Sequence, residues 1–180
     1  MKDIEVFLDE VISKEGNYSF DPADSGGETN FGITKFVANS FGYTGQMKDL
    51  TKDIAKEIYR KRYWIQPKFN QIYLISQSIA LMLTDIGINM GPATGVKFLQ
   101  RALNVLNNGG TAYPDMTVDG VLGVMTITSL KKFLNLRGAL GESVIIKLIN
   151  SQRAVRYMEI SEASPKNERF TYGWIANRVE

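Results

Sequence analysis

Residues 76–90 place the strongest constraint on the fold, because this helix-length segment is apolar on almost every face. A helix without a continuous polar face must be enclosed by other elements, so we expect it to be the central buried helix. Two polar residues, Asp85 and Asn89, lie one helical turn apart on it and share a face. Buried polar groups need partners, so this pair either braces neighbouring helix ends or lines a cleft. The apolar residues are Ile79, Ala80, Leu81, Met82, Leu83, Ile86, Ile88 and Met90.

The flanking sequence supplies further helices and almost no strands. Apolar residues recur at helical spacing in residues 3–14, 34–40, 52–64, 92–106, 127–134, 142–160 and 165–179. Thr34 and Thr51 stand where helix N-caps are expected, and the alternating charges of residues 52–62 are typical of a solvated face. Proline and glycines interrupt residues 18–33, which predicts a short irregular hairpin. The expected fold is therefore mainly α, with a small β-hairpin after the first helix.

Residues 14–34 concentrate carboxylates, glycines and aromatics as no other segment does. Glu15 follows the first predicted helix directly, at an end whose partial negative charge disfavours a second anion. A partly buried carboxyl group there suits a general acid. A hairpin that returns toward this helix end would bring Asp24 and Thr29 to face Glu15. Turn chemistry alone also accounts for an Asp at position 24, so its role stays open here.

The composition excludes several kinds of catalytic site. The chain has no Cys and no His, which rules out thiol nucleophiles, disulfides, Ser-His-Asp triads and His-ligated zinc. Catalysis must then use carboxylates, Lys, Tyr or hydroxyl groups, and glycosidic-bond hydrolysis is the commonest carboxylate chemistry. Residues 115–126 resemble half of a calcium loop, but Thr126 replaces the closing Glu, so we expect no metal or other cofactor.

Charge and hydropathy limit the partners and the location. The net charge of +2 is too small to indicate a nucleic-acid partner. The first residues contain no apolar stretch like that of a signal peptide, and no segment is apolar enough to cross a membrane. We therefore expect synthesis in the cytoplasm of a host or bacterium, without an export signal.

The motif around Glu15 resembles the N-terminal signature of glycoside hydrolase family 108, the phage and bacterial N-acetylmuramidases with a lysozyme-like helical fold. The matching residues are Glu15-Gly16-Asn17-Tyr18 and Asp21-Pro22-x-Asp24-x-Gly26-Gly27-x-Thr29-x-Phe31-Gly32-Ile33-Thr34. The family often has Gly where this chain has Asn17, a mild departure because Asn tolerates the same left-handed backbone.

The second half resembles the predicted peptidoglycan-binding region that usually follows this catalytic segment. The matching motifs are Asp85-x-x-x-Asn89-x-Gly91-Pro92, Leu99-Gln100-x-Ala102-Leu103, Asp119-Gly120-x-x-Gly123-x-x-Thr126 and Phe170-x-x-Gly173-Trp174. The predicted segments are therefore a muramidase segment, 1–90, and a peptidoglycan-binding segment, 91–180, packed together as one compact unit.

The resemblance implies an endolysin-like lysozyme that cleaves the β-1,4 bond between N-acetylmuramic acid and N-acetylglucosamine. Glu15 is the implied catalytic acid, and Asp24 and Thr29 fall close to the Glu, Asp and Thr spacing of phage lysozymes, Thr29 one residue nearer to Asp24. The predicted substrate-binding residues are Tyr18, Asp85, Asn89 and Gln100. A lytic transglycosylase acting on the same bond and a non-catalytic peptidoglycan-binding protein are the alternatives.

The implied setting is that of phage endolysins, which accumulate in the cytoplasm and reach the cell wall after a holin opens the membrane. A bacterial or prophage-derived enzyme would have the same sequence features. The expected partner is bacterial peptidoglycan, and the expected state is a monomer.

Overall fold

The computed structural model describes residues 3–16, 18–20 and 27–179 and divides the chain into two compact units. Unit 1 is Met1–Gln66 and unit 2 is Pro67–Glu180. Helices dominate both units, and the two strands form a small antiparallel hairpin after the first helix. The predicted fold class, mainly α with a hairpin in this place, is confirmed.

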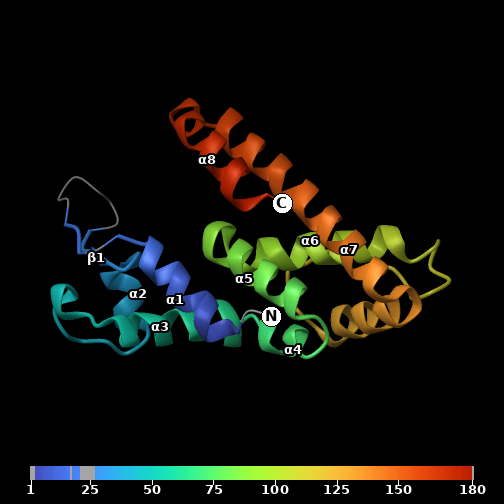
Figure 1. Ribbon diagram of the computed structural model, residues 1–180, viewed down its shortest axis with the longest axis horizontal. Coiled ribbons are helices and arrows are strands. Elements are labelled where there is room, and N and C mark those ends of the chain that lie inside the picture. Colours follow the sequence, from blue (N-terminus) through green and yellow to red (C-terminus); the bar gives the residue numbers. More distant parts are fainter. Residues whose placement is uncertain (1–2, 17, 21–26, 180) are drawn as a thin grey trace. The chain divides into compact units, whose positions relative to one another are not determined.

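Unit 1 is built from two longer helices and a hairpin (Figure 1). A helical segment, α1, precedes the hairpin and α3 follows it, with the short helix α2 directly after the second strand. The bounds are α1 Ile4–Lys14, β1 Thr29–Asn30, β2 Ile33–Thr34, α2 Lys35–Ser40, the 3-10 turn η1 Met47–Asp49, α3 Lys52–Arg60 and the π-helical turn η2 Lys61–Ile65. The hydroxyl groups of Thr34 and Thr51 accept the N–H groups of Val37 and Ile54, which confirms both predicted N-caps. Asp3 precedes α1 without a side-chain cap hydrogen bond.

An ion-pair ladder fixes α1 against α3. Arg60 contacts Glu5 at 2.6 Å, and Lys56 contacts both Glu5 at 3.2 Å and Asp9 at 2.8 Å. Lys52 adds a contact to Asp9 at 3.6 Å. The charged face of α3, predicted to be solvated, therefore packs partly on α1, because the acidic residues of α1 repeat at the matching helical spacing. The ladder sets the position of the C-terminal end of α1 relative to α3.

A tight turn joins β1 to β2. Phe31 and Gly32 both have positive φ, 50° and 70°, as a two-residue turn of this hand requires. Thr29 pairs with Thr34 and Asn30 with Ile33. The buried Asn30 amide donates to the Met47 carbonyl oxygen at 2.8 Å, which anchors the hairpin to the following segment.

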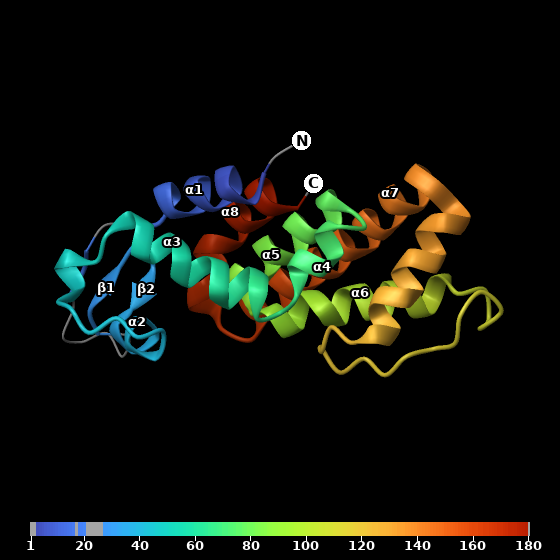
Figure 2. The same ribbon diagram turned by 90° about the horizontal axis from the view of Figure 1, so that it is seen from below.

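Unit 2 surrounds α5, the helix predicted to be central (Figures 1 and 2). The bounds are α4 Phe69–Tyr73, α5 Gln77–Met90, α6 Pro92–Leu106, α7 Val124–Glu162, the 3-10 turn η3 Pro165–Asn167 and α8 Glu168–Arg178. α5 packs against α4, α6 and α7, and its apolar residues Ile79, Leu83 and Ile86 have no solvent exposure. Gly138, with φ 58° and ψ −147°, breaks α7 into the two helices that the sequence predicts. The short helix α4 was not predicted.

The two compact units are defined by packing, whereas the predicted segments 1–90 and 91–180 are defined by sequence motifs and stay a prediction. The boundary between the units falls after residue 66, so α4 and α5 group with the helices that follow them. Within the described residues, no helix is both long enough and apolar enough to span a membrane.

Candidate active site

Glu15 is the first residue beyond α1. Its N–H group donates to the Val11 carbonyl oxygen at 3.2 Å and completes the last helical turn. Its own backbone is extended, with φ −74° and ψ 145°, so the chain leaves the helix at this residue. The side chain is half-buried. The predicted position of Glu15 at a helix end is therefore observed.

The Glu15 carboxyl group lies against the turn of the hairpin and the hydroxyl group of Tyr59. A Cβ atom built on Gly32 would lie 2.6 Å from Glu15 Oε2 and 2.8 Å from Tyr59 Oη. Both oxygens are therefore within 2.8 Å of one point beside the Gly32 backbone. Only a residue without a side chain leaves room for the carboxyl group there. Helix α1, the hairpin and α3 thus meet at Glu15.

Tyr59 holds the hairpin turn from the other side. Its hydroxyl group donates to the Phe31 carbonyl oxygen at 3.2 Å. Burial raises the pKa of the Tyr59 phenol well above its usual range, and the negative charge of Glu15 raises it further. The phenol therefore stays protonated and keeps its hydrogen to donate.

A second phenol, Tyr63, borders Tyr59 on the next helical turn, with ring centroids 5.4 Å apart. Burial raises the pKa of Tyr63, and the Arg62 guanidinium, 5.4 Å from the ring centroid, opposes that rise. The charge of Glu15 contributes to the shift of Tyr63 as well. Two neutral phenols, Tyr59 buried and Tyr63 half-buried, thus lie close enough to Glu15 for its charge to affect both.

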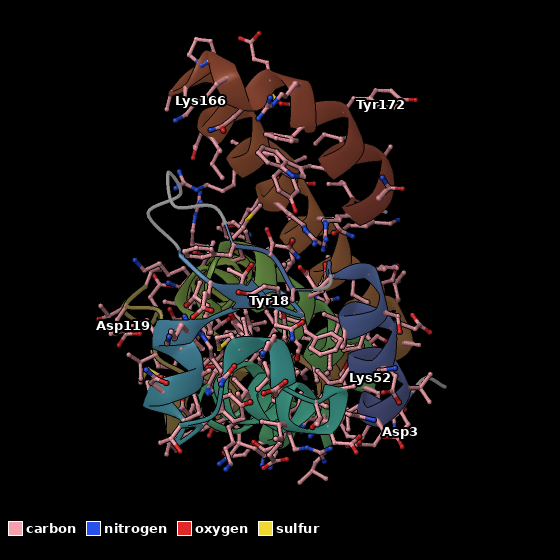
Figure 3. All side chains as sticks on the ribbon, turned by 90° about the vertical axis from the view of Figure 1, so that its left-hand side faces the viewer. Asp3, Tyr18, Lys52, Asp119, Lys166 and Tyr172 are labelled. Atoms are coloured by element: carbon pink, nitrogen blue, oxygen red, sulfur yellow. The ribbon has the colours of Figure 1, made fainter. Side chains whose placement is uncertain are left out.

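The predicted substrate-binding residue Tyr18 lies on the segment that enters the hairpin and is 42% exposed (Figure 3). Its hydroxyl group donates to Glu28 at 3.0 Å, and Lys35 donates to the same carboxylate at 2.8 Å. The hydrogen bond from Lys35, and then that from Tyr18, lower the pKa of Glu28. This chain of contacts fixes the Tyr18 ring at the surface of unit 1.

Thr29, predicted to assist catalysis, occupies the centre of the small sheet. Its backbone exchanges two hydrogen bonds of 2.9 Å with Ser19, and it pairs with Thr34 on the other side. Thr29 is therefore held in a fixed register, with its side chain partly exposed. Asp24, the other predicted partner of Glu15, lies outside the described residues.

Asp85 and Asn89, the other predicted substrate-binding residues of the first segment, lie in unit 2 on α5. Asp85 forms ion pairs with Arg153 of α7 and, at 3.1 Å, with Arg178 of α8. Asn89 donates to the Asp85 carbonyl oxygen at 2.7 Å and is exposed. The sequence left two roles open for this pair, bracing neighbouring helices or lining a cleft. The ion pairs of Asp85 connect α5 to α7 and α8, as a brace between helices does.

Comparison with known proteins identifies the family. Residues 8–91 match the family model described as glycosyl hydrolase 108, and residues 94–179 match the model described as predicted peptidoglycan domain. These matches assign residues 8–91 to glycosyl hydrolase family 108 and residues 94–179 to the predicted peptidoglycan domain. On these two matches, this glycosyl hydrolase acts on peptidoglycan. The resemblance inferred from the motif around Glu15 is therefore confirmed.

One solved structure extends the match across the fold. The solved structure of Brucella abortus SagA shares 26% sequence identity with this chain. The alignment covers 96% of this chain and 87% of the SagA chain, with a TM-score of 0.67. This similarity agrees with the lysozyme-like helical fold predicted for a glycosyl hydrolase 108 protein. No protein with curated annotation matches the sequence.

Gln100 lies in the peptidoglycan domain and is 2% exposed. Its amide nitrogen donates to Asp119 at 2.8 Å and to the Val121 carbonyl oxygen at 3.2 Å. Its amide oxygen accepts the Gly120 N–H group at 2.9 Å. These contacts hold the loop after α6 and do not support the prediction that Gln100 binds substrate.

Two residues next to Glu15 were not singled out from the sequence. By sequence, Gly32 is a helix breaker and a motif position, and Tyr59 is one of the apolar residues at helical spacing in 52–64. Their proximity to Glu15 depends on how α1 and α3 pack, and sequence spacing does not specify that packing. Among the described residues, no cluster of acidic side chains could hold a metal ion.

Proposed function

We propose that this glycosyl hydrolase is an N-acetylmuramidase of the lysozyme class, and that Glu15 is its general acid. Its bond would be the β-1,4 linkage between N-acetylmuramic acid and N-acetylglucosamine. The observation that carries the proposal is the position of the Glu15 carboxyl group, half-buried at a helix end between Gly32 and the neutral phenol of Tyr59. A carboxyl group in a partly enclosed position next to a substrate-accessible loop is the arrangement that a general acid needs.

In the proposed reaction, protonated Glu15 donates its hydrogen to the glycosidic oxygen as the bond to the sugar breaks. Asp24, together with Thr29, then positions or activates a water molecule that completes hydrolysis. A water between the carboxyl groups requires a separation of roughly 6.5–9.5 Å and inverts the anomeric centre, whereas about 5 Å implies retention. The anomer of the first product, read by NMR, therefore reports the role of Asp24.

The test compares the wild type with Glu15→Gln on purified sacculi. The variant keeps the size of the side chain and removes its acidic hydrogen, so we expect the fold to persist and lysis to fall by at least about 100-fold. Glu10→Gln is the matched control, because it changes the same residue type at an exposed position of the same helix. Turbidity loss reports lysis, and circular dichroism reports folding. Normal lysis by folded Glu15→Gln protein would remove Glu15 from this role.

Mass spectrometry of the released fragments tests the reaction type. Hydrolysis adds water, so a muramidase leaves hydrated reducing ends. Anhydro ends would instead identify a lytic transglycosylase on the same bond. If wild type and variant both bind sacculi and release nothing, the protein is a peptidoglycan-binding protein and the enzyme proposal fails.

We also propose that the enzyme reaches the cell wall from the cytoplasm, as phage endolysins do. Expression in the cytoplasm alone should then leave cells intact, whereas co-expression with a holin should lyse them. Lysis without the holin would contradict this part of the proposal.

A further inference from the structure

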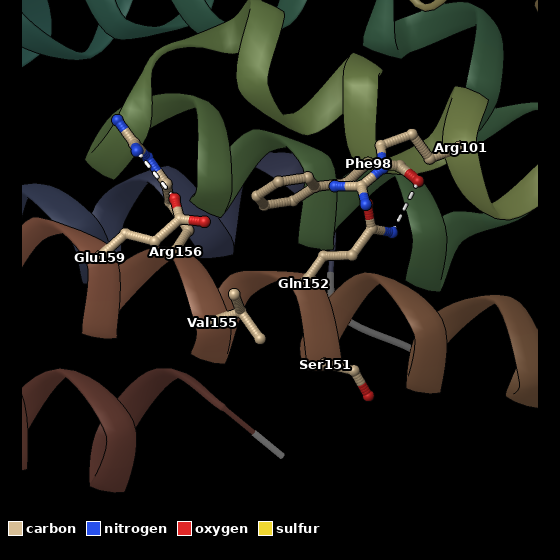
Figure 4. Close-up of a pocket in the computed structure, with 7 residues that line it drawn as sticks. All are labelled: Phe98, Arg101, Ser151, Gln152, Val155, Arg156 and Glu159. Carbon is tan, nitrogen blue, oxygen red and sulfur yellow. Dashed lines mark hydrogen bonds and ion pairs between the residues drawn. The ribbon is translucent and has the colours of Figure 1, made fainter.

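A pocket of about 200 Å³ opens between α6 and α7 of unit 2 (Figure 4). It lies within the match to the peptidoglycan domain. Its volume is below the roughly 300–1,000 Å³ of typical small-molecule sites, so it suits one side-chain-sized group rather than a disaccharide. The lining residues are Phe98, Arg101, Ser151, Gln152, Val155, Arg156 and Glu159.

The wall of the pocket is apolar and has no exposed aromatic face. Phe98 is only 6% exposed, and Val155 beside it is 52% exposed. Sugar rings usually bind on the open face of an aromatic side chain, and the buried Phe98 ring offers none. An aliphatic or peptide group fits this wall better than a sugar ring does.

The rim of the pocket carries one unbalanced positive charge. Arg156 pairs with Glu159 at 2.9 Å, so these two charges neutralise each other. Arg101 is exposed and has no carboxylate partner among the described residues. A guanidinium group binds carboxylates with charge-assisted, often bidentate hydrogen bonds, so Arg101 favours a ligand with a carboxylate.

Gln152 lines the pocket and carries an unpaired hydrogen-bond acceptor. Its amide nitrogen donates to the carbonyl oxygens of Phe98, at 3.0 Å, and Leu148, at 3.1 Å, which fixes the side chain. Its Oε1 atom is buried and accepts no hydrogen bond within the described part of the chain. A peptide N–H group would supply the missing donor once the Gln152 amide turns toward the pocket opening.

We propose that this pocket binds the carboxylate-bearing peptide stem of peptidoglycan, with Arg101 contacting the carboxylate and Gln152 the peptide backbone. The proposal rests on peptidoglycan being the substrate of this glycosyl hydrolase, and it adds the part of the polymer that the second domain recognises. It does not depend on Glu15, because every residue of the pocket lies in unit 2.

The test uses the full chain with Glu15→Gln, so that no probe is turned over. Isothermal titration with the soluble tetrapeptide L-Ala-γ-D-Glu-meso-diaminopimelate-D-Ala should give saturable binding. Arg101→Gln should weaken that binding at least about tenfold, since it removes a charge-assisted contact. Arg137→Gln is the matched control, an exposed arginine of α7 outside the pocket, and should leave binding unchanged.

Two further probes test which part of peptidoglycan binds. An amidated peptide tests the contribution of the carboxylates, and chitotetraose tests whether the glycan binds at the same place. The tetrapeptide with its carboxylates converted to amides should bind at least about tenfold more weakly, and chitotetraose should not compete. Absence of tetrapeptide binding, equal binding by Arg101→Gln, equal binding of the amidated peptide, or competition by chitotetraose would each overturn the proposal. A wild type that binds the tetrapeptide but fails to clear sacculi would overturn the muramidase proposal alone.

Discussion

Gly32→Ala tests whether the position of the Glu15 carboxyl group governs activity. The new methyl group would lie 2.6 Å from Glu15 Oε2 and 2.8 Å from Tyr59 Oη, closer than real Cβ atoms approach other heavy atoms. The backbone at residue 32 belongs to a tight turn and cannot move without breaking the pairing of Asn30 with Ile33. The Glu15 side chain must therefore shift.

The expected magnitudes follow from these contacts. An L-residue at φ 70° costs about 1–2 kcal/mol, which lowers the melting temperature of a chain of this size by about 2–8 °C. Most of the protein then remains folded at 25 °C. Displacing a catalytic group by about 1 Å can reduce the rate by about 100-fold, so we expect activity to fall far more than stability.

The assay measures clearing of sacculi per folded molecule, beside a thermal melt. Gly42→Ala is the control, because Gly42 has φ 87° in the same unit and a Cβ atom there would meet nothing within 4 Å. It should lose a similar amount of stability and keep its activity. If both variants lose the same activity, the contact of Gly32 with Glu15 has no special role and the argument is refuted.

Three further predictions concern other contacts. Tyr59→Phe removes the donor to the Phe31 carbonyl oxygen, so activity should fall about tenfold and the free energy of unfolding by about 1 kcal/mol; an unchanged rate would exclude Tyr59 as a positioning residue. Hydrogen bonds from Lys56 lower the pKa of Asp9, so the ladder stabilises the fold above the unfolded value of about 4 and loses its effect as pH falls below it. Melting temperatures measured from pH 6 to pH 2 should drop less in Lys56→Met than in the wild type. Gln100→Leu should reduce the free energy of unfolding by about 2–4 kcal/mol in urea, because it leaves the Gly120 N–H group without its partner. Weaker sacculus binding at unchanged stability would instead support a substrate-binding role for Gln100.

Features that depend on neighbouring residues could be predicted from the sequence. The end of α1 at Lys14, the caps at Thr34 and Thr51, the proline at the start of α6 and the hairpin after α1 all follow from local backbone chemistry. The burial of α5 followed from its lack of a polar face, a property of the segment alone.

Features that depend on tertiary packing could not be predicted. The proximity of Glu15 to Tyr59 requires α1 to lie against α3, and the ion-pair ladder between these helices joins residues about fifty positions apart. The charges of α3 looked solvated, because a sequence does not show which helix lies opposite. The same limit applies to Asp85, whose arginine partners are 68 and 93 residues away.

The contrast between Glu15 and Asp85 separates two kinds of motif residue in this family. Both residues lie in the region matched by the glycosyl hydrolase 108 model. Both carry carboxyl groups, and both are partly buried. Asp85 forms ion pairs with two arginines, one of them buried. These ion pairs connect α5 to α7 and α8 in unit 2. Glu15 instead lies beside Gly32 and the neutral phenol of Tyr59, and no ion pair joins its carboxyl group to another described residue. The matched region therefore holds one carboxylate whose ion pairs connect helices and another, Glu15, that has no such ion pair among the described residues and is the proposed acid.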